Sequence, residues 1–127
     1  MKIVTTLSIA AFVIGCASVP KRPAESSGVV FQQSLEKTRE AAIDALVVLG
    51  FDIKKQETSY VEGFRPRKVG LFVGSGGETV GIWLESLDND RTRVLVKTAK
   101  SLVGIVGQKT WDEEVLQEME KARHQKD

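Results

Sequence analysis

The chain has little of the chemistry on which small enzymes and metal proteins depend. Its 127 residues include a single cysteine and a single histidine. One cysteine excludes an internal disulfide and cannot build a zinc site of the usual cysteine-rich kind. The histidine, His124, lies in a charged C-terminal segment, where solvation explains it better than catalysis. Neither a Cys–His nor a Ser–His arrangement can be assembled, and we therefore predict that the chain is not an enzyme.

An excess of charge of either sign is also lacking. The chain carries 18 Lys and Arg against 17 Asp and Glu, and 17 of each remain when the N-terminal Lys2 is left aside. A neutral domain lacks the basic surface that drives binding to nucleic acid. It also lacks a strong attraction to anionic lipid headgroups. Nucleic acid is therefore not an expected partner.

The polar clusters do not predict a metal or a cofactor. Glu36, Glu40 and Asp44 recur every fourth residue among basic residues, which is typical of a solvated helix face. The segment Asp88–Asp90 has turn chemistry but lacks the glycine and the distant glutamate of a calcium loop. In the glycine-rich stretch after Gly104, Gln108 interrupts the contiguous Gly-Lys-Thr of a phosphate-binding loop. We expect no metal, cofactor or nucleotide site.

The N-terminus, by contrast, has the features of an exported protein. Lys2 supplies a positive charge, and an uncharged, mostly apolar run follows from Ile3 to Ile14. The tetrapeptide Val13–Cys16 then resembles the lipobox of bacterial lipoproteins. That resemblance implies cleavage between Gly15 and Cys16, a diacylglycerol on the thiol, and an acyl chain such as palmitate on the new amine. A membrane-spanning helix or a buried core helix is the alternative, although 18 uncharged residues are at the short limit for spanning.

The residues after Cys16 predict where the anchor holds the protein. Several acyl chains on one residue give stable membrane attachment. In the better-understood lipoproteins an Asp next to the cysteine favours the inner membrane, so Ala17 indicates the outer membrane, facing the periplasm. Residues 17–28 contain two prolines and three serines and no apolar period, which predicts a flexible tether. We thus divide the chain into a signal peptide (1–15), a lipidated cysteine with its tether (16–28) and one domain (29–127).

That domain is predicted to be α+β, with an antiparallel sheet of about four to six strands and two helices packed on it. Ser34 is the expected N-cap of one helix, and Gly50 ends it, with Phe51 placed to touch Leu46 as in a Schellman motif. The second helix is expected to start from a capping box at residues 110–113. Its apolar stripe comprises Trp111, Val115, Met119 and Ala122.

Between the helices the pattern favours strands. Residues 29–31, 51–55 and 60–65 are expected as short strands, and 69–73 as an apolar piece separated from the next strand by the glycine-rich segment 74–77. Residues 78–86 and 91–98 form the clearest hairpin, with its turn centred on Asn89. The predicted cross-strand pairs are Leu84 with Val94, Ile82 with Val96, Val80 with Thr98, Glu85 with Arg93, and Trp83 with Leu95.

Two apolar, glycine-flanked segments have an open interpretation. They are Leu71, Phe72 and Val73, and Leu102, Val103, Ile105 and Val106. Either they are buried connections, or they form an exposed surface for a protein partner or the membrane. Trp83, on the hairpin face opposite Ile82, has the same two interpretations. The basic run 65–68 is expected in a loop, solvated or near lipid headgroups.

Taken together, these features resemble a known group. The lipobox Cys16, the helix 41–49 running into Gly50–Ile53, the strand 92–98 and the segment 107–111 are similar to the small proteobacterial lipoproteins built around a domain of unknown function. The likeness covers most of residues 29–121. A fainter likeness is to the helix-grip modules in the accessory lipoprotein of the outer-membrane β-barrel assembly machine. Neither resemblance supplies catalytic residues.

The sequence therefore favours a non-enzymatic interaction or assembly module of the cell envelope, bound to membrane lipid through its anchor and to an envelope protein through its surface. The alternative is a periplasmic carrier of a small apolar ligand. Its pocket would lie between helix and sheet, near Phe72, Trp83 and Trp111.

Overall fold

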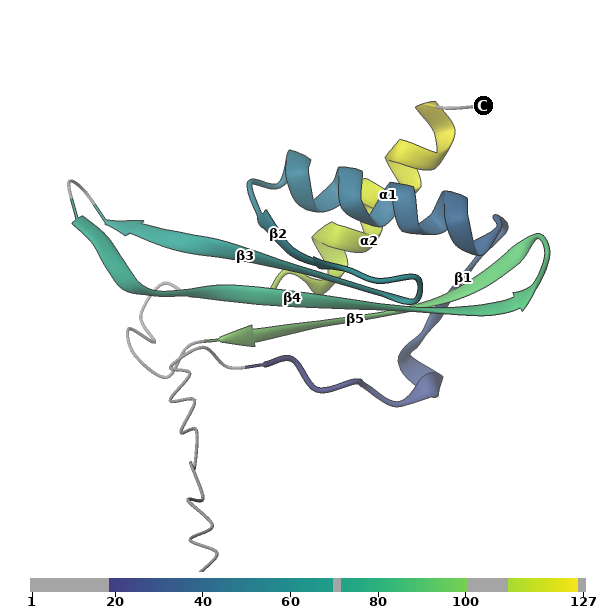
Figure 1. The fold of residues 1–127 in the computed structure, drawn as a ribbon, viewed down its shortest axis with the longest axis horizontal. Coiled ribbons are helices and arrows are strands. Elements are labelled where there is room, and N and C mark those ends of the chain that lie inside the picture. The colour runs from purple at the N-terminus through teal and green to yellow at the C-terminus, as the bar shows by residue number, and fades with distance from the viewer. Residues whose placement is uncertain (1–18, 70–71, 101–109, 126–127) are drawn as a thin grey trace, which may run out of the picture.

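The computed structural model describes residues 19–69, 72–100 and 110–125. These residues form a five-stranded antiparallel sheet with two helices on one face, so the predicted α+β fold is confirmed (Figure 1). The strands follow the order β1-β5-β4-β3-β2 across the sheet. The elements are η1 (Glu25–Ser27), β1 (Val29–Phe31), α1 (Leu35–Val48), β2 (Asp52–Gln56), β3 (Tyr60–Val69), β4 (Phe72–Asp88), β5 (Arg91–Lys100) and α2 (Asp112–Gln125).

Both ends of α1 form as the sequence predicts. The Ser34 hydroxyl accepts a hydrogen bond from the Lys37 amide at 3.3 Å and so caps the first turn. At the other end Gly50 has a φ of 88°, a left-handed conformation in which a side chain is strained. The amide of Gly50 donates to the Val47 carbonyl at 3.1 Å, and that of Phe51 to the Leu46 carbonyl at 2.9 Å. This pair of bonds is the Schellman motif, and it turns the chain into β2.

The β4–β5 hairpin has the predicted register. All five predicted pairs, from Val80 with Thr98 to Glu85 with Arg93, lie opposite each other. The register shifts between Ser86 and Asp88, which places one extra residue in β4 before the turn. The Asp88 carboxylate then accepts from the Arg91 side chain at 2.6 Å and from the Asp90 amide at 2.9 Å. The hydrogen bond from Arg91 is the main reason why the pKa of Asp88 is lowered.

The prediction that the glycine-rich segment 74–77 separates two strands is wrong. Strand β4 runs without a break from Phe72 to Asp88, and β3 extends to Val69 beside it. Gly77 lies opposite Pro66, and a Cβ at Gly77 would overlap the Arg65 carbonyl oxygen. Glycine therefore permits a close approach of the two strands here. The basic run 65–68, expected in a loop, consequently lies in β3.

The core lies between the helices and the sheet. Val115 and Met119 of the predicted stripe are fully buried, and Trp111 is 8% exposed. The start of α2 differs from the predicted capping box, because the helix begins at Asp112, and the Val115 amide donates to the Trp111 carbonyl. Thr98 of β5 supplies the hydroxyl instead, accepting from the Trp111 amide at 2.9 Å and donating to Asp112 at 2.6 Å. The largest fully buried apolar side chains of this core are Phe31, Leu46, Val61, Val80, Ile82, Val94, Val115 and Met119.

Candidate functional site

Most of the residues singled out from the sequence lie outside the described part of the chain. These are the lipobox residues Gly15 and Cys16 and the apolar residues Leu71, Leu102, Val103, Ile105 and Val106. Phe72 and Val73 belong to β4, but their side chains are not described. Trp83 is therefore the one residue of the predicted partner surface whose side chain can be placed.

Trp83 lies on the face of the sheet that points away from the helices, here called the outer face. Its neighbours Ile82 and Leu84 are buried in the core, and side chains alternate between the two faces along a strand. The Trp83 ring is half-buried and lies beside the Tyr60 ring, with 5.1 Å between the centroids and 40° between the planes. These two rings form an aromatic pair on the outer face.

Tyr60 is fixed in this pair by a neighbour on the same strand. Its hydroxyl donates a hydrogen bond to the Glu62 carboxylate at 2.6 Å. Partial burial is the largest cause that raises the pKa of Tyr60 well above its usual range, followed by this hydrogen bond and the negative charges of Glu62 and Glu57. Tyr60 consequently remains a neutral hydrogen-bond donor.

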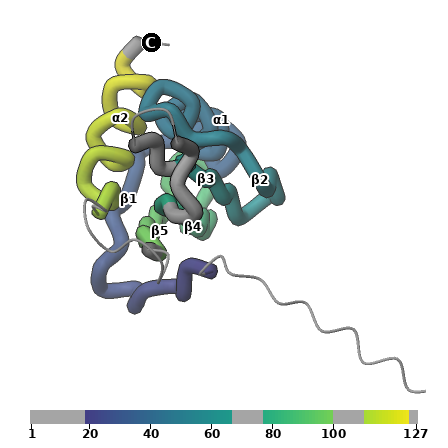
Figure 2. The backbone as a smooth tube through the Cα atoms, turned by 90° about the vertical axis from the view of Figure 1, so that its left-hand side faces the viewer, coloured from purple at the N-terminus to yellow at the C-terminus, as the bar shows by residue number. Residues whose placement is uncertain are grey.

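Residues 19–28, here called the strap, run along the outer face. Figure 2 shows this segment on the opposite side of the sheet from both helices. Pro20 is buried directly over Gly81, where an added Cβ would lie 3.1 Å from the Pro20 Cβ. The same Cβ would lie 2.9 Å from the Trp83 ring and 2.9 Å from the Tyr60 hydroxyl. Because Gly81 has no side chain, the Trp83 ring, the Tyr60 hydroxyl and Pro20 come together over it, and this place is here called the notch.

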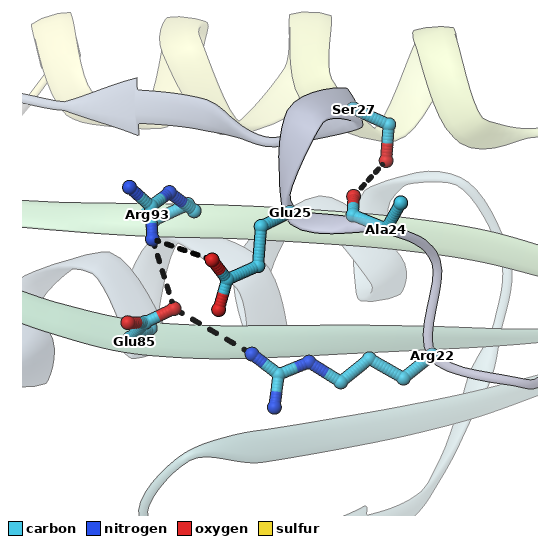
Figure 3. Close-up of polar contacts among 6 residues, drawn as sticks. All are labelled: Arg22, Ala24, Glu25, Ser27, Glu85 and Arg93. Carbon is cyan, nitrogen blue, oxygen red and sulfur yellow. Dashed lines mark hydrogen bonds and ion pairs between the residues drawn. The ribbon is translucent and has the colours of Figure 1, made fainter.

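A chain of alternating charges joins the strap to the sheet (Figure 3). Glu85 of β4 accepts from Arg93 of β5 at 3.1 Å and pairs with Arg22 of the strap at 3.5 Å. Arg93 also lies 3.9 Å from Glu25 of the strap. Two strap charges therefore meet two sheet charges of opposite sign.

The end of the strap closes tightly onto β5. A Cβ at Gly28 would lie 2.8 Å from the Arg93 side chain and 2.9 Å from that of Leu95. Leu95 is 1% exposed although it lies on the outer face. The strap therefore buries an apolar residue that the helices do not reach.

Over residues 19–28 these contacts differ from the expectation of a flexible tether at residues 16–28, of which 16–18 lie outside the described part of the chain. From Val19 onward the segment lies against the sheet and includes the short helix η1. The sequence signal that could have indicated this is the pair Pro20 and Pro23, because proline is apolar and stiff as well as a helix breaker. A search for apolar periodicity does not detect an isolated proline.

The two tryptophans, which the carrier hypothesis placed near one pocket, lie on opposite faces of the sheet. Trp111 contacts Phe51 edge to face, with centroids 5.4 Å apart at 89°. The Arg65 guanidinium lies 4.9 Å from the Trp111 ring centroid, and its Nε donates to the Leu49 carbonyl at 3.3 Å. Trp83 is on the outer face, and buried side chains fill the space between helices and sheet. The described residues therefore do not bring Trp83 and Trp111 to one pocket.

No protein-family model matches the chain, and no curated protein sequence matches it either. Among residues 19–69, 72–100 and 110–125, no three His, Cys, Asp or Glu side chains gather in a group that could hold a metal ion. Within the same ranges neither helix is sufficiently long and apolar to cross a membrane. The outer face around Trp83 is thus the candidate site that the described residues define best.

Proposed function

We propose that the protein is a lipoprotein of the bacterial cell envelope that acts as a non-enzymatic interaction or assembly module. The observation that carries this proposal is the order of features at the N-terminus: a lysine, an uncharged apolar run, and the Gly15–Cys16 pair of a lipobox. In this proposal Cys16 carries a diacylglycerol and an N-acyl chain. Ala17 then directs the protein to the outer membrane, facing the periplasm.

The family of the protein is likewise a proposal, based on the resemblance of its sequence. We place the protein with the small proteobacterial lipoproteins that contain a compact α+β domain. The shape of the described domain, with two helices on one face of an antiparallel sheet, is compatible with that placement.

The outer face supports the interaction role. Tryptophan, tyrosine and arginine are the residue types enriched where protein partners bind most strongly. Trp83, Tyr60 and Arg93 lie together on this face, and each retains partial exposure. The helix side of the sheet, by contrast, is committed to the core.

Photo-crosslinking in intact envelopes tests this function. A photoreactive amino acid at Lys97, which is exposed on β5 opposite Gly81, is expected to form an adduct with one envelope protein. The matched control carries the same amino acid at Gln117, which is exposed on α2. A pull-down of the intact lipoprotein is expected to recover the same partner in stoichiometric amount. Repeated absence of an adduct, or equal adducts from both positions, would contradict the proposal.

A further inference from the structure

We propose that the outer face is a binding site for a proline-containing basic peptide segment, that the strap occupies this site within the chain, and that a partner segment of the same chemistry displaces it. The inference rests on the proposed role as an interaction module and specifies its partner. Three features of the described residues support it: the notch at Gly81, the Glu85 carboxylate close to it, and the weakness of the ion pairs that hold the strap.

The notch suits proline because of its shape and because proline is stiff. Gly81 removes the side chain that would otherwise occupy the space, and Trp83 and Tyr60 lie beside the opening. Proline-rich segments are stiff, lose little entropy on binding, and dock onto aromatic surfaces in many recognition modules. Pro20 is buried in this position. Any other segment that offers a proline ring can make the same contact.

The acid supplies the second element of recognition. Glu85 pairs with Arg22, two residues after Pro20, at 3.5 Å. Arg93 holds the Glu85 carboxylate from the other side at 3.1 Å, so its position does not depend on the strap. The site therefore binds a segment in which a proline is followed, two residues later, by a basic residue.

The ion pairs that hold the strap are weak enough for exchange. The side chains of Arg22 and Glu85 are 50% and 40% exposed, and that of Glu25 is 67% exposed. Exposed ion pairs of this kind contribute about 0–1 kcal/mol each. The backbone amides of Ser27 and Gly28 donate to carbonyls within the strap, at Ala24 and Glu25, and not to the sheet.

The core does not depend on the strap either. It lies on the other face of the sheet, between β-strands and helices. The strap can therefore leave while the domain stays folded. Its covalent link gives it an effective concentration of about millimolar, which a partner segment must overcome.

The test measures binding of a labelled peptide to purified, detergent-solubilised full-length protein. The peptide has the sequence of residues 18–28, and its fluorescence anisotropy reports binding. The test variant, Pro20→Gly with Arg22→Glu, removes the notch contact and repels Glu85. The matched control, Lys21→Glu with Pro23→Gly, makes the same two kinds of change one position away from each contact. Circular dichroism confirms that both variants fold.

We expect the test variant to bind the peptide saturably and at least about tenfold more tightly than the control, whose own strap still competes. A peptide with glycine at position 20 and glutamate at position 22 should not bind. Absence of binding by the test variant, or equal binding of both peptides, would overturn the proposal. The assay needs neither the lipid nor an envelope partner, so its failure is distinguishable from a failure of the proposed function.

Discussion

Replacement of Cys16 with serine is expected to abolish both lipid labelling and delivery to the outer membrane. The serine hydroxyl does not replace the thiol to which the diacylglycerol is attached. The loss is large because each buried methylene of the acyl chains contributes about 0.8 kcal/mol to membrane attachment. Metabolic labelling with radioactive palmitate and separation of inner from outer membranes on a density gradient measure the two effects.

The control for this prediction is Ala17→Ser, which changes the neighbouring residue and leaves the thiol in place. It should be labelled and found in the outer membrane like the parent protein. A Cys16→Ser protein that incorporates palmitate and fractionates as the parent does would contradict the prediction.

Replacement of Leu46 with alanine is expected to lower the free energy of unfolding by about 2–5 kcal/mol, the range for truncation of a large buried aliphatic side chain. Leu46 is fully buried in the core, and its Cδ1 lies 3.1 Å from the position that a Cβ on Gly63 would take. It also belongs to the turn that ends α1, where its carbonyl accepts from the Phe51 amide. Denaturant unfolding followed by circular dichroism measures the change.

The adjacent residue provides a matched control. Val47 lies on the same helix and is 58% exposed, so Val47→Ala should change the free energy of unfolding by no more than about 0.5 kcal/mol. Equal losses for the two variants would show that the core does not lie where the structure places it.

The parts of the fold that sequence reasoning predicted correctly are those fixed by local chemistry. Ser34 and Gly50 define the ends of α1 because each satisfies backbone groups within one turn. The register of β4 and β5 follows from the turn at Asn89, with one extra residue in β4 before it, and from the alternation of apolar residues beside it. Such signals need no knowledge of distant segments.

The predictions that differ from the structure concern places where a contact with a segment distant in the sequence determines the local structure. The start of α2 differs from the prediction because the hydroxyl of Thr98, 13 residues before Trp111, accepts the hydrogen bond from the Trp111 amide. The glycines of β4 pair with β3 rather than end the strand. The packing of the strap on the sheet cannot be predicted in this way, because Pro20 packs at the notch of Gly81, which is distant in the sequence. The sequence leaves two interpretations for Trp83, and periodicity assigns neither its contact with Tyr60 nor the position of Pro20 near it.

The lipoprotein proposal is tested most directly by the intact mass of the protein extracted from membranes, together with sequencing of its N-terminal peptide. We predict a chain that begins at Cys16 and exceeds its polypeptide mass by a diacylglycerol and one further acyl chain. A chain that begins at Met1, or a Cys16 with a free thiol, would contradict the lipoprotein proposal.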